Sequence, residues 1–317
     1  MACHRQKPYN EGIKQQREGI VLLLKKLDIH AHVTLEKGYP CMGGGRDWAL
    51  TPPDLRGMYD RIGVEKGVAL PLVSPEYQTD QLSNRDARLA AEQYPETIGW
   101  WFCNVDPRWL LRSPESDFSV IFNYYKALGA KGIGEFTPSM RVDDPLMQNV
   151  FAHAEKCDLP VLFHIGPVNY KYGILDDLGL PNIEKTLQKF PKLRLIGHSH
   201  MWWSEISGDC TNENRGTDPK GPVTPGGRAV ELMRNYPGML ADLSAGSGEN
   251  AIMRDPAFGY KFLEEFQDKI FFGVDYCTLS NYRKLSAFLD EGVEMGRISQ
   301  KAYNKICREN LLALVGE

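Results

Sequence analysis

The stretch Leu27-Asp28-Ile29-His30-Ala31-His32-Val33 combines a short apolar run with two histidines. An apolar run of this length, bounded by polar residues, is typical of a buried β-strand. Successive side chains of a strand point to opposite faces, so His30 and His32 share one face. We therefore expect two imidazoles to converge at the end of a first strand.

Seven more apolar runs follow, and helix-like amphipathic stretches separate several of them. The eight runs are residues 27–33, 66–73, 98–105, 132–136, 159–165, 193–197, 239–243 and 269–274, and the clearest helical stretches are 82–94, 117–128, 145–157 and 256–266. Strands that alternate with helices indicate βαβ units and a parallel sheet, and eight such units predict a closed α/β fold, the (β/α)8 TIM barrel. An open doubly wound sheet is the alternative, weakened because no G-x-G-x-x-G follows the first strand.

The repeats predict one domain over residues 27–317, preceded by an N-terminal extension over residues 1–26. Residues 34–53 and 201–227 form connections long enough to build or cover a site at the carboxyl ends of the strands. Residues 299–315 begin with a serine cap and carry apolar residues at helical spacing. This pattern predicts a final packing helix.

Composition restricts the class of protein. The 317 residues are 42% hydrophobic and 25% charged, with a net charge of −4 and no long basic run, so we expect neither nucleic acid nor membrane as a partner. The apolar stretch at residues 20–24 is too short for a membrane span or a signal peptide. Seven cysteines without a C-x-x-C pair suit a reducing compartment, so we expect a cytoplasmic protein.

Ionisable residues end several of the apolar runs. His164 ends the fifth run, His198 ends the sixth, Asp275 follows the eighth, and Glu135 lies in the fourth. In a barrel these groups and the first two histidines would meet at one end, where burial costs several kcal/mol unless they share a partner. Three imidazoles and one carboxylate suit Zn²⁺, and Mn²⁺, Fe²⁺, Co²⁺ or Ni²⁺ are further candidates.

Several motifs together resemble one family. DIHAHV, GWWFCNVDP, GIGEF, LPVLFHIG, LIGHSH, ADLSA, FFGVDY and ENLLALVG resemble, in order, the amidohydrolase-related family of the amidohydrolase superfamily. This family holds aminocarboxymuconate-semialdehyde decarboxylase, resorcylate decarboxylases and several lactonases, and the resemblance covers about residues 27–316.

The resemblance implies a role for each matching residue. His30, His32 and His164 correspond to metal-binding histidines, and Asp275 to an aspartate that binds metal or handles a proton. His198 corresponds to a histidine that shuttles a proton or polarises a carbonyl. Glu135 either orients a ligand imidazole or bridges to a second metal, so the centre is mononuclear or binuclear.

Four residues on the connections are candidates for substrate binding. Arg141 could clamp a carboxylate, His200 could replace His198, and Trp202 and Tyr170 could wall a flat substrate. Each also has a simpler interpretation as a solvated charge, a loop hydrogen-bonder or a packed ring.

The sequence thus predicts a metal-dependent hydrolase of a small lactone, cyclic ester or amide. The alternative is a nonoxidative decarboxylase of an aromatic or unsaturated carboxylic acid. A TatD-like nuclease and a non-catalytic barrel are less favoured, and a homo-oligomer is compatible with the sequence.

Overall fold

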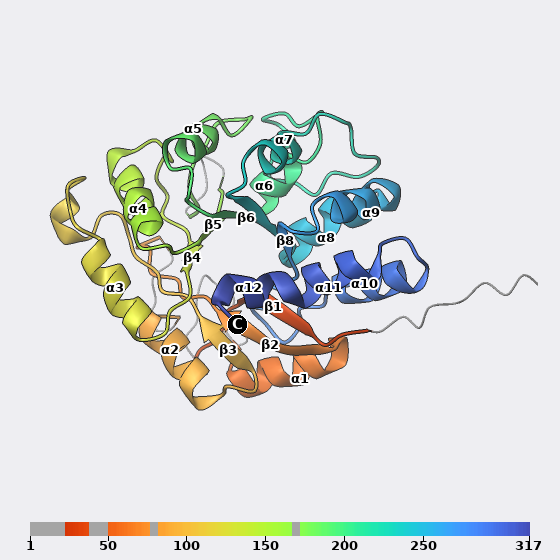
Figure 1. Cartoon of the computed structure of the whole chain (residues 1–317), viewed down its shortest axis with the longest axis horizontal. Coiled ribbons are helices and arrows are strands. Elements are labelled where there is room, and N and C mark those ends of the chain that lie inside the picture. Colours follow the sequence, from red (N-terminus) through yellow and green to blue (C-terminus); the bar gives the residue numbers. More distant parts are fainter. Residues whose placement is uncertain (1–22, 38–49, 77–81, 167–171) are drawn as a thin grey trace, which may run out of the picture.

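The computed structural model describes residues 23–37, 50–76, 82–166 and 172–317, in which parallel strands alternate with helices (Figure 1). The strands are β1 (Lys26–Ala31), β2 (Val64–Ala69), β3 (Ile98–Trp101), β4 (Ile133–Phe136), β5 (Val161–His164), β6 (Leu195–His198), β7 (Met239–Asp242) and β8 (Ile270–Phe271). Each of them overlaps one of the eight predicted runs. The α/β class with parallel strands is therefore confirmed.

The helices lie on the outside of the strands in Figure 1. They are α1 (Pro52–Ile62), α2 (Asn84–Gln93), α3 (Ser119–Ala127), α4 (Pro145–Lys156), α5 (Pro181–Lys189), α6 (His200–Ser204), α7 (Arg228–Asn235), α8 (Ala245–Met253), α9 (Pro256–Glu265), α10 (Leu285–Glu294), α11 (Gln300–Asn304) and α12 (Asn310–Val315), with short turns η2 (Leu110–Arg112) and η3 (Lys305–Glu309). The four amphipathic stretches form α2, α3, α4 and α9. Proline at the first turn and capping by Asp144 and Asp255 explain where α4 and α9 begin.

The strands form two sheets in sequence order, β1-β2-β3 and β4-β5-β6-β7-β8. The sheets are linked at both edges. Cys103, after β3, bridges to Ile133 of β4, and Ala31 of β1 bridges to Tyr276, after β8. His164 and His198 are direct neighbours in the register of β5 and β6, so their side chains leave the sheet at the same level.

Asp28 ties β1 to the chain that follows β8. Its Oδ1 accepts hydrogen bonds from the backbone N–H of His30 at 2.9 Å and of Val274 at 3.0 Å, and its Oδ2 accepts one from the Tyr59 hydroxyl at 2.5 Å. Burial raises the pKa of the Asp28 carboxyl to about 7, although all three donors oppose that rise. These hydrogen bonds hold β1 next to the segment that follows β8.

Two apolar cores lie on opposite faces of the strands. The inner core draws side chains from seven of the eight strands, among them Leu27 and Ile29 of β1, while Ala31 and Val33 belong to the outer core beneath the helices. Between Asp28 and Ala31, three steps along β1 match two steps along β2, which marks a bulge. The extra residue reverses the alternation, so that His30 and His32 face inward together with Ile29.

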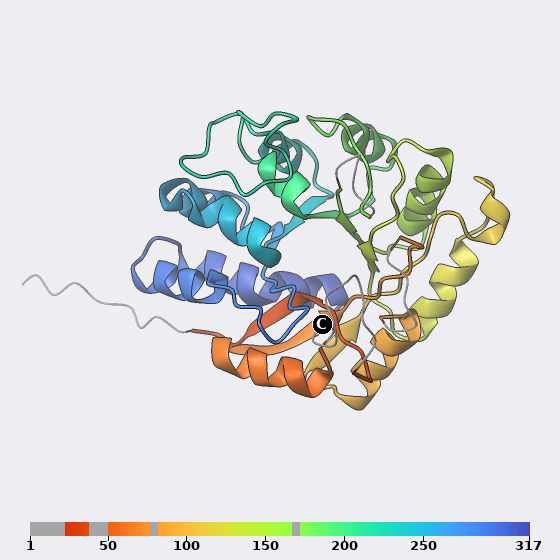
Figure 2. The ribbon, with the colours of Figure 1, turned by 180° about the vertical axis from the view of Figure 1, so that it is seen from behind.

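The end of the chain covers the inner core at the amino ends of the strands. From α11 through the π-helical turn η3 to α12 the chain forms one continuous helix, as predicted for residues 299–315. Leu311 and Val315 join the inner core, and the indole of Trp100 donates to Glu317 Oε1 at 2.8 Å. Figure 1 shows α12 lying across the strands, and Figure 2 views the molecule from the opposite end.

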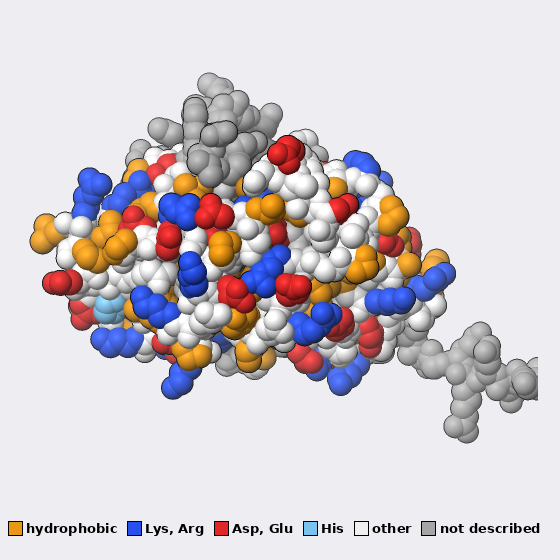
Figure 3. All heavy atoms as spheres, turned by 90° about the horizontal axis from the view of Figure 1, so that it is seen from above, with side chains coloured by type: hydrophobic (Ala, Val, Ile, Leu, Met, Phe, Trp, Pro, Cys, Tyr) orange, Lys and Arg blue, Asp and Glu red, His pale blue; other side chains and the backbone are white. Residues whose placement is uncertain are grey.

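The surface carries charges of both signs. On the face shown in Figure 3, Lys and Arg side chains are interspersed with Asp and Glu. No helix within the described ranges is both long and apolar enough to cross a membrane. Of the predicted N-terminal extension, residues 1–22 lie outside the described residues, and β1 begins at Lys26.

We predict that Asp28→Ala lowers the free energy of unfolding by about 3 kcal/mol or more, because two backbone N–H groups and a buried hydroxyl lose their acceptor. Asp28→Asn keeps one oxygen for the two N–H donors and should cost less. Urea unfolding monitored by circular dichroism measures both. As a control, Asp60→Ala removes a mostly exposed partner of Arg56 and should change stability by less than about 1 kcal/mol. Equal losses for Asp28→Ala and Asp60→Ala would contradict this role.

Candidate metal centre

Seven ionisable side chains gather at the carboxyl ends of the strands. Parallel strands end on the same side, so the last residues of several strands meet there. The residues are His30 and His32 at the end of β1, Glu135 of β4, His164 of β5, His198 of β6, Asp242 of β7 and Asp275 after β8. Six of the seven were predicted from the sequence.

The two histidines of β1 point their Nε2 atoms at the same space. Nδ1 of His32 lies 2.9 Å from the carbonyl oxygen of Leu70, which can only accept, so this nitrogen carries the proton. Nδ1 of His30 lies 2.7 Å from Oδ2 of Asp242, whose pKa is held far below its usual range because the hydrogen bonds from His198 and His30 outweigh burial. In its neutral form each imidazole therefore carries its lone pair on Nε2, and these two atoms are 3.0 Å apart.

Asp242 also positions His198. Its Oδ2 accepts a hydrogen bond from the Ser244 hydroxyl at 2.6 Å and lies 3.1 Å from Nδ1 of His198. Because Ser244 gives its proton to Asp242, its oxygen can only accept from His198 Nδ1, which is 3.1 Å away. Nδ1 of His198 is thus a donor, and the lone pair of this imidazole is also on Nε2.

Glu135 lies among the imidazoles rather than behind one of them. Oε1 is 2.8 Å from Nδ1 of His164 and 3.7 Å from Nε2 of His198. Oε2 is 3.3 Å from Nε2 of His32 and 3.7 Å from Nε2 of His30. Burial would raise the pKa of the Glu135 carboxyl, but the neighbouring imidazoles of His164, His30 and His32 hold it well below the usual value.

Asp275 enters the cluster through an uncommon backbone conformation. Its φ is +51°, in the left-handed region, and its N–H donates to the carbonyl oxygen of His30 at 3.1 Å. Oδ1 then lies 3.6 Å from the Nε2 atoms of both His30 and His32. His30 and Asp275 are therefore neighbours, as a closed strand order predicts.

Burial and neighbouring charge act in opposite directions on the histidines. Burial opposes a proton on His30, but Asp275, Asp242 and Glu135 together raise the pKa of this imidazole well above its usual value. Burial dominates at His164 and lowers its pKa, despite the hydrogen bond to Glu135. A cation bound close to His30 would therefore compete with the proton on this imidazole.

Ligand atoms within 4.8 Å of one another fall into three groups: His30, His32 and Asp275; Glu135, His164 and His198; and His30, His198 and Asp242. His164 belongs to a different group from the other three predicted ligands. Glu135 shares the group of His164, and its Oε2 also lies 3.3 Å from Nε2 of His32. Asp242 and Ser244 were missed as functional residues. The sequence signal for Asp242 was present, because it ends the seventh apolar run as His164 and His198 end theirs.

The candidate substrate-binding residues lie apart from this cluster. Arg141 is about half exposed and already pairs with Asp143 and Asp177. Nε2 of His200 lies 3.2 Å from Asp218 at the surface. Trp202 is fully buried in the outer core, edge-on to Phe163, and Tyr170 lies outside the described residues.

One aromatic ring, that of Tyr172, lies beside the cluster. The ring of Tyr172 has its centre 4.7 Å from that of His164 and packs against the buried residues Leu72 and Leu82. These contacts fix an aromatic ring next to the ionisable groups.

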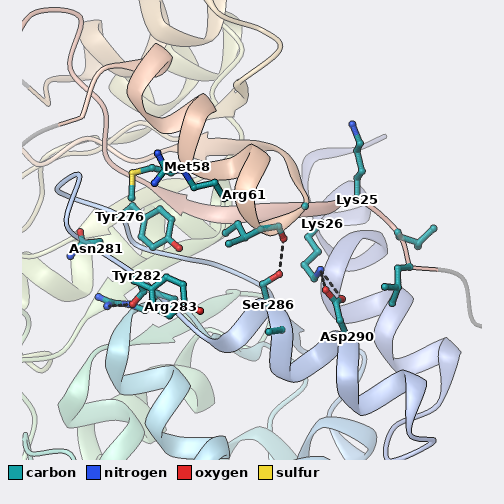
Figure 4. Close-up of a pocket in the computed structure, with 15 residues that line it drawn as sticks. Lys25, Lys26, Met58, Arg61, Tyr276, Asn281, Tyr282, Arg283, Ser286 and Asp290 are labelled. Carbon is teal, nitrogen blue, oxygen red and sulfur yellow. Dashed lines mark hydrogen bonds and ion pairs between the residues drawn. The ribbon is translucent and has the colours of Figure 1, made fainter.

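A groove of about 490 Å³ between α1 and α10 is not part of this site (Figure 4). It is lined by none of the seven cluster residues. Lys26 Nζ pairs there with Asp290 at 2.7 Å, and the Ser286 hydroxyl donates to the carbonyl oxygen of Ile62.

No protein-family model and no curated protein sequence matches the chain. Solved structures do match it. A protein from Acinetobacter baumannii assigned as 2-pyrone-4,6-dicarboxylic acid hydrolase, with citric acid bound, has a TM-score of 0.56 at 16% identity, covering 93% of this chain and 100% of that chain.

Two further structures extend the comparison. Dihydroxybenzoic acid decarboxylase from Polaromonas, with bound manganese and the inhibitor 2-nitroresorcinol, has a TM-score of 0.52 at 16% identity, over 93% of this chain and 97% of that chain. Amidohydrolase 2 from Bifidobacterium longum subsp. infantis has a TM-score of 0.53 at 15% identity, over 93% and 99%. The chain therefore has the fold of these amidohydrolase-type hydrolases and decarboxylases, and the sequence resemblance is confirmed at the level of the fold.

Proposed function

We propose that this protein is a metal-dependent enzyme of the amidohydrolase type, built on a closed (β/α)8 barrel. The bridges that link the two sheets at both edges support the closed barrel. We infer the metal site from the Nε2 atoms of His30 and His32, which lie 3.0 Å apart and each present a lone pair when the imidazole is neutral. Two such lone pairs repel each other unless a cation or a proton lies between them.

The residues present fit a divalent ion. His30 and His32 would bind it through Nε2 and Asp275 through a carboxylate oxygen, with His164 and Glu135 completing the set. A bound divalent ion would polarise a substrate oxygen or lower the pKa of a water molecule. Zn²⁺ suits the imidazoles, while the two carboxylates and the manganese in the Polaromonas decarboxylase support Mn²⁺.

Among the reactions, we favour nonoxidative decarboxylation of an aromatic or unsaturated carboxylic acid over hydrolysis. Decarboxylases such as 2,6-dihydroxybenzoate decarboxylase are prominent among the similar structures. The ring of Tyr172 beside His164, packed on Leu72 and Leu82, would stack on a planar ring of the substrate. Hydrolysis of a cyclic ester remains the second candidate, supported by the similarity to the assigned pyrone dicarboxylate hydrolase.

Two side chains can move the proton that either reaction needs. Asp275 is the most exposed carboxylate of the cluster, with 19% of its side chain accessible, so it can reach substrate. In decarboxylation the bond to the carboxyl carbon breaks and CO₂ leaves. A proton then passes to the ring carbon from Asp275 in its protonated form or from His198 protonated at Nε2. In hydrolysis Asp275 accepts the proton of the attacking water, and His198, with a second proton on Nε2, stabilises the developing negative charge on the substrate oxygen.

We predict that Asp275→Asn lowers kcat by ~10²- to 10⁴-fold, because an amide of the same shape cannot exchange the proton. The assay follows CO₂ release from 2,6-dihydroxybenzoate, with 2-pyrone-4,6-dicarboxylate as the second probe, and circular dichroism checks folding. Turnover by Asp275→Asn at the wild-type rate would contradict the role of this carboxylate in both reactions.

The two reactions leave different products. Wild-type protein loaded with Mn²⁺ or Zn²⁺ should release CO₂ and place a solvent hydrogen on carbon when it decarboxylates a probe. Hydrolysis in ¹⁸O-labelled water should instead place label in a product carboxylate without CO₂. Labelled carboxylate product, with no CO₂ from any carboxylate probe, would contradict decarboxylation. That result would still be consistent with a metal-dependent hydrolase.

We predict that Asp242→Asn weakens Mn²⁺ or Zn²⁺ binding ~10- to 100-fold, because Asp242 fixes the proton of His30 on Nδ1 and so keeps Nε2 for the metal. Titration calorimetry on protein stripped with a chelator measures the affinity. Asp143→Asn, at an exposed partner of Arg141, is the matched control and should bind as the wild type does. Unchanged affinity in Asp242→Asn would show that this carboxylate does not position the ligands.

A further inference from the structure

Large hydrophobic side chains gather on one edge of the molecule. The described residues expose ten of them, and five fall within or beside α3: Leu110, Leu111, Val120, Tyr124 and Leu128. Figure 3 shows hydrophobic side chains collected at its left end, where Figure 1 places α3 and the segment before it. A contiguous exposed patch of this kind marks an interaction surface more often than scattered single residues do.

The patch follows the geometry of the helix. Val120, Tyr124 and Leu128 are four residues apart, so they form one stripe along α3, and they are 68%, 62% and 41% exposed. The opposite side of the same helix is already used, because Phe118 and Phe122 are fully buried in the outer core. The ring of Tyr124 is held edge-on against Tyr125, with centres 5.3 Å apart. The exposed stripe therefore lies on a different face of α3 from the one that packs against the core.

The turn before α3 adds a projecting apolar residue. Leu110, Leu111 and Arg112 have φ values of 56°, 67° and 54°, a left-handed run that costs roughly 1–2 kcal/mol per residue. The Ser116 hydroxyl holds the turn by donating to the carbonyl oxygen of Leu110 at 2.6 Å. The turn leaves Leu111 98% exposed.

Charge around the stripe indicates which partner fits it. Glu115 and Asp117 lie at the amino end of α3, while Lys131 lies just beyond its carboxyl end. Lys126 is already used within the molecule, because its Nζ donates to the carbonyl oxygen of Cys157 at 2.7 Å. A second α3 packed antiparallel, with a two-fold axis near Tyr124, would place each acidic end against a basic end. It would also place Val120 against Leu128 of the partner subunit, and Tyr124 against its own copy. Such self-complementarity is what a two-fold interface requires.

We propose that the stripe Val120–Tyr124–Leu128, extended by Leu111, binds a second copy of this chain in that antiparallel arrangement. The surface lies on the outer side of α3 and uses none of the metal-centre residues, so the proposal is independent of the proposed reaction. Burial of these side chains removes apolar area from water, and the charges at the two ends set the direction.

Sedimentation velocity on the full chain, over micromolar concentrations, tests the proposal. We expect wild-type protein to sediment as a dimer, and the double variant V120E/Y124E as a monomer with unchanged circular dichroism. Met295→Glu places a charge on a hydrophobic residue of similar exposure, 66%, away from α3, and should leave the dimer intact. A monomeric wild type would overturn the proposal and leave the stripe to a different protein. A dimer that survives in the double variant would also overturn it.

Cross-linking tests the direction of the pairing. Tyr124→Cys lies near the proposed axis, so two copies of this cysteine should form a disulfide-linked dimer on mild oxidation. Wild-type protein and Met295→Cys, treated in the same way, should not. Lys131→Glu should weaken the dimer by bringing like charges together. Cross-linking of Tyr124→Cys no greater than that of Met295→Cys would contradict the antiparallel two-fold arrangement.

Discussion

Three imidazoles of this protein present electron pairs to one buried space, and that convergence constrains everything around it. Nδ1 of His30, His32 and His198 each donates to a fixed acceptor, so in the neutral imidazoles each Nε2 keeps its lone pair. Burying such groups without a shared partner costs several kcal/mol. A divalent cation would remove the repulsion, and the carboxylates of Glu135 and Asp275 would balance its charge.

Two features of the fold produce this arrangement. The bulge in β1 turns His30 inward beside Ile29, and without it strict alternation would send one of them to the helix side. Asp28 then fixes β1 against the chain after β8, which brings Asp275 beside His30. Because α12 covers the inner core at the amino ends of the strands, the polar cluster lies at the opposite, carboxyl end.

Much of this could be predicted from the sequence, because its signals are periodic. Apolar runs separated by helical stretches located all eight strands, and histidines at the ends of runs located most of the cluster. Parallel strands bring their last residues together whatever their separation in the chain. For that reason His30 and Asp275 could be expected to meet although the whole domain lies between them.

Other features depend on partners that local patterns do not encode. Asp242 was missed because a single acid at the end of a run does not reveal that it accepts from two histidines of other strands. The bulge depends on register with β2, which the sequence of β1 does not contain. Trp202 follows His198 closely in sequence, yet it packs outward on Phe163, because the short helix α6 turns its ring away from the strand ends. Glu135 reaches all four imidazoles only because the strands bring them around it.

The central claim is that the cluster holds a divalent ion, and elemental analysis of the purified protein tests it most directly. Wild-type protein prepared without chelators, then incubated with Mn²⁺ and Zn²⁺ and desalted, should retain at least one equivalent of divalent metal per chain. The variant H30A/H32A, folded by circular dichroism, should retain little. Wild-type protein that holds no divalent metal after this loading, or a double variant that holds as much as the wild type, would contradict the claim.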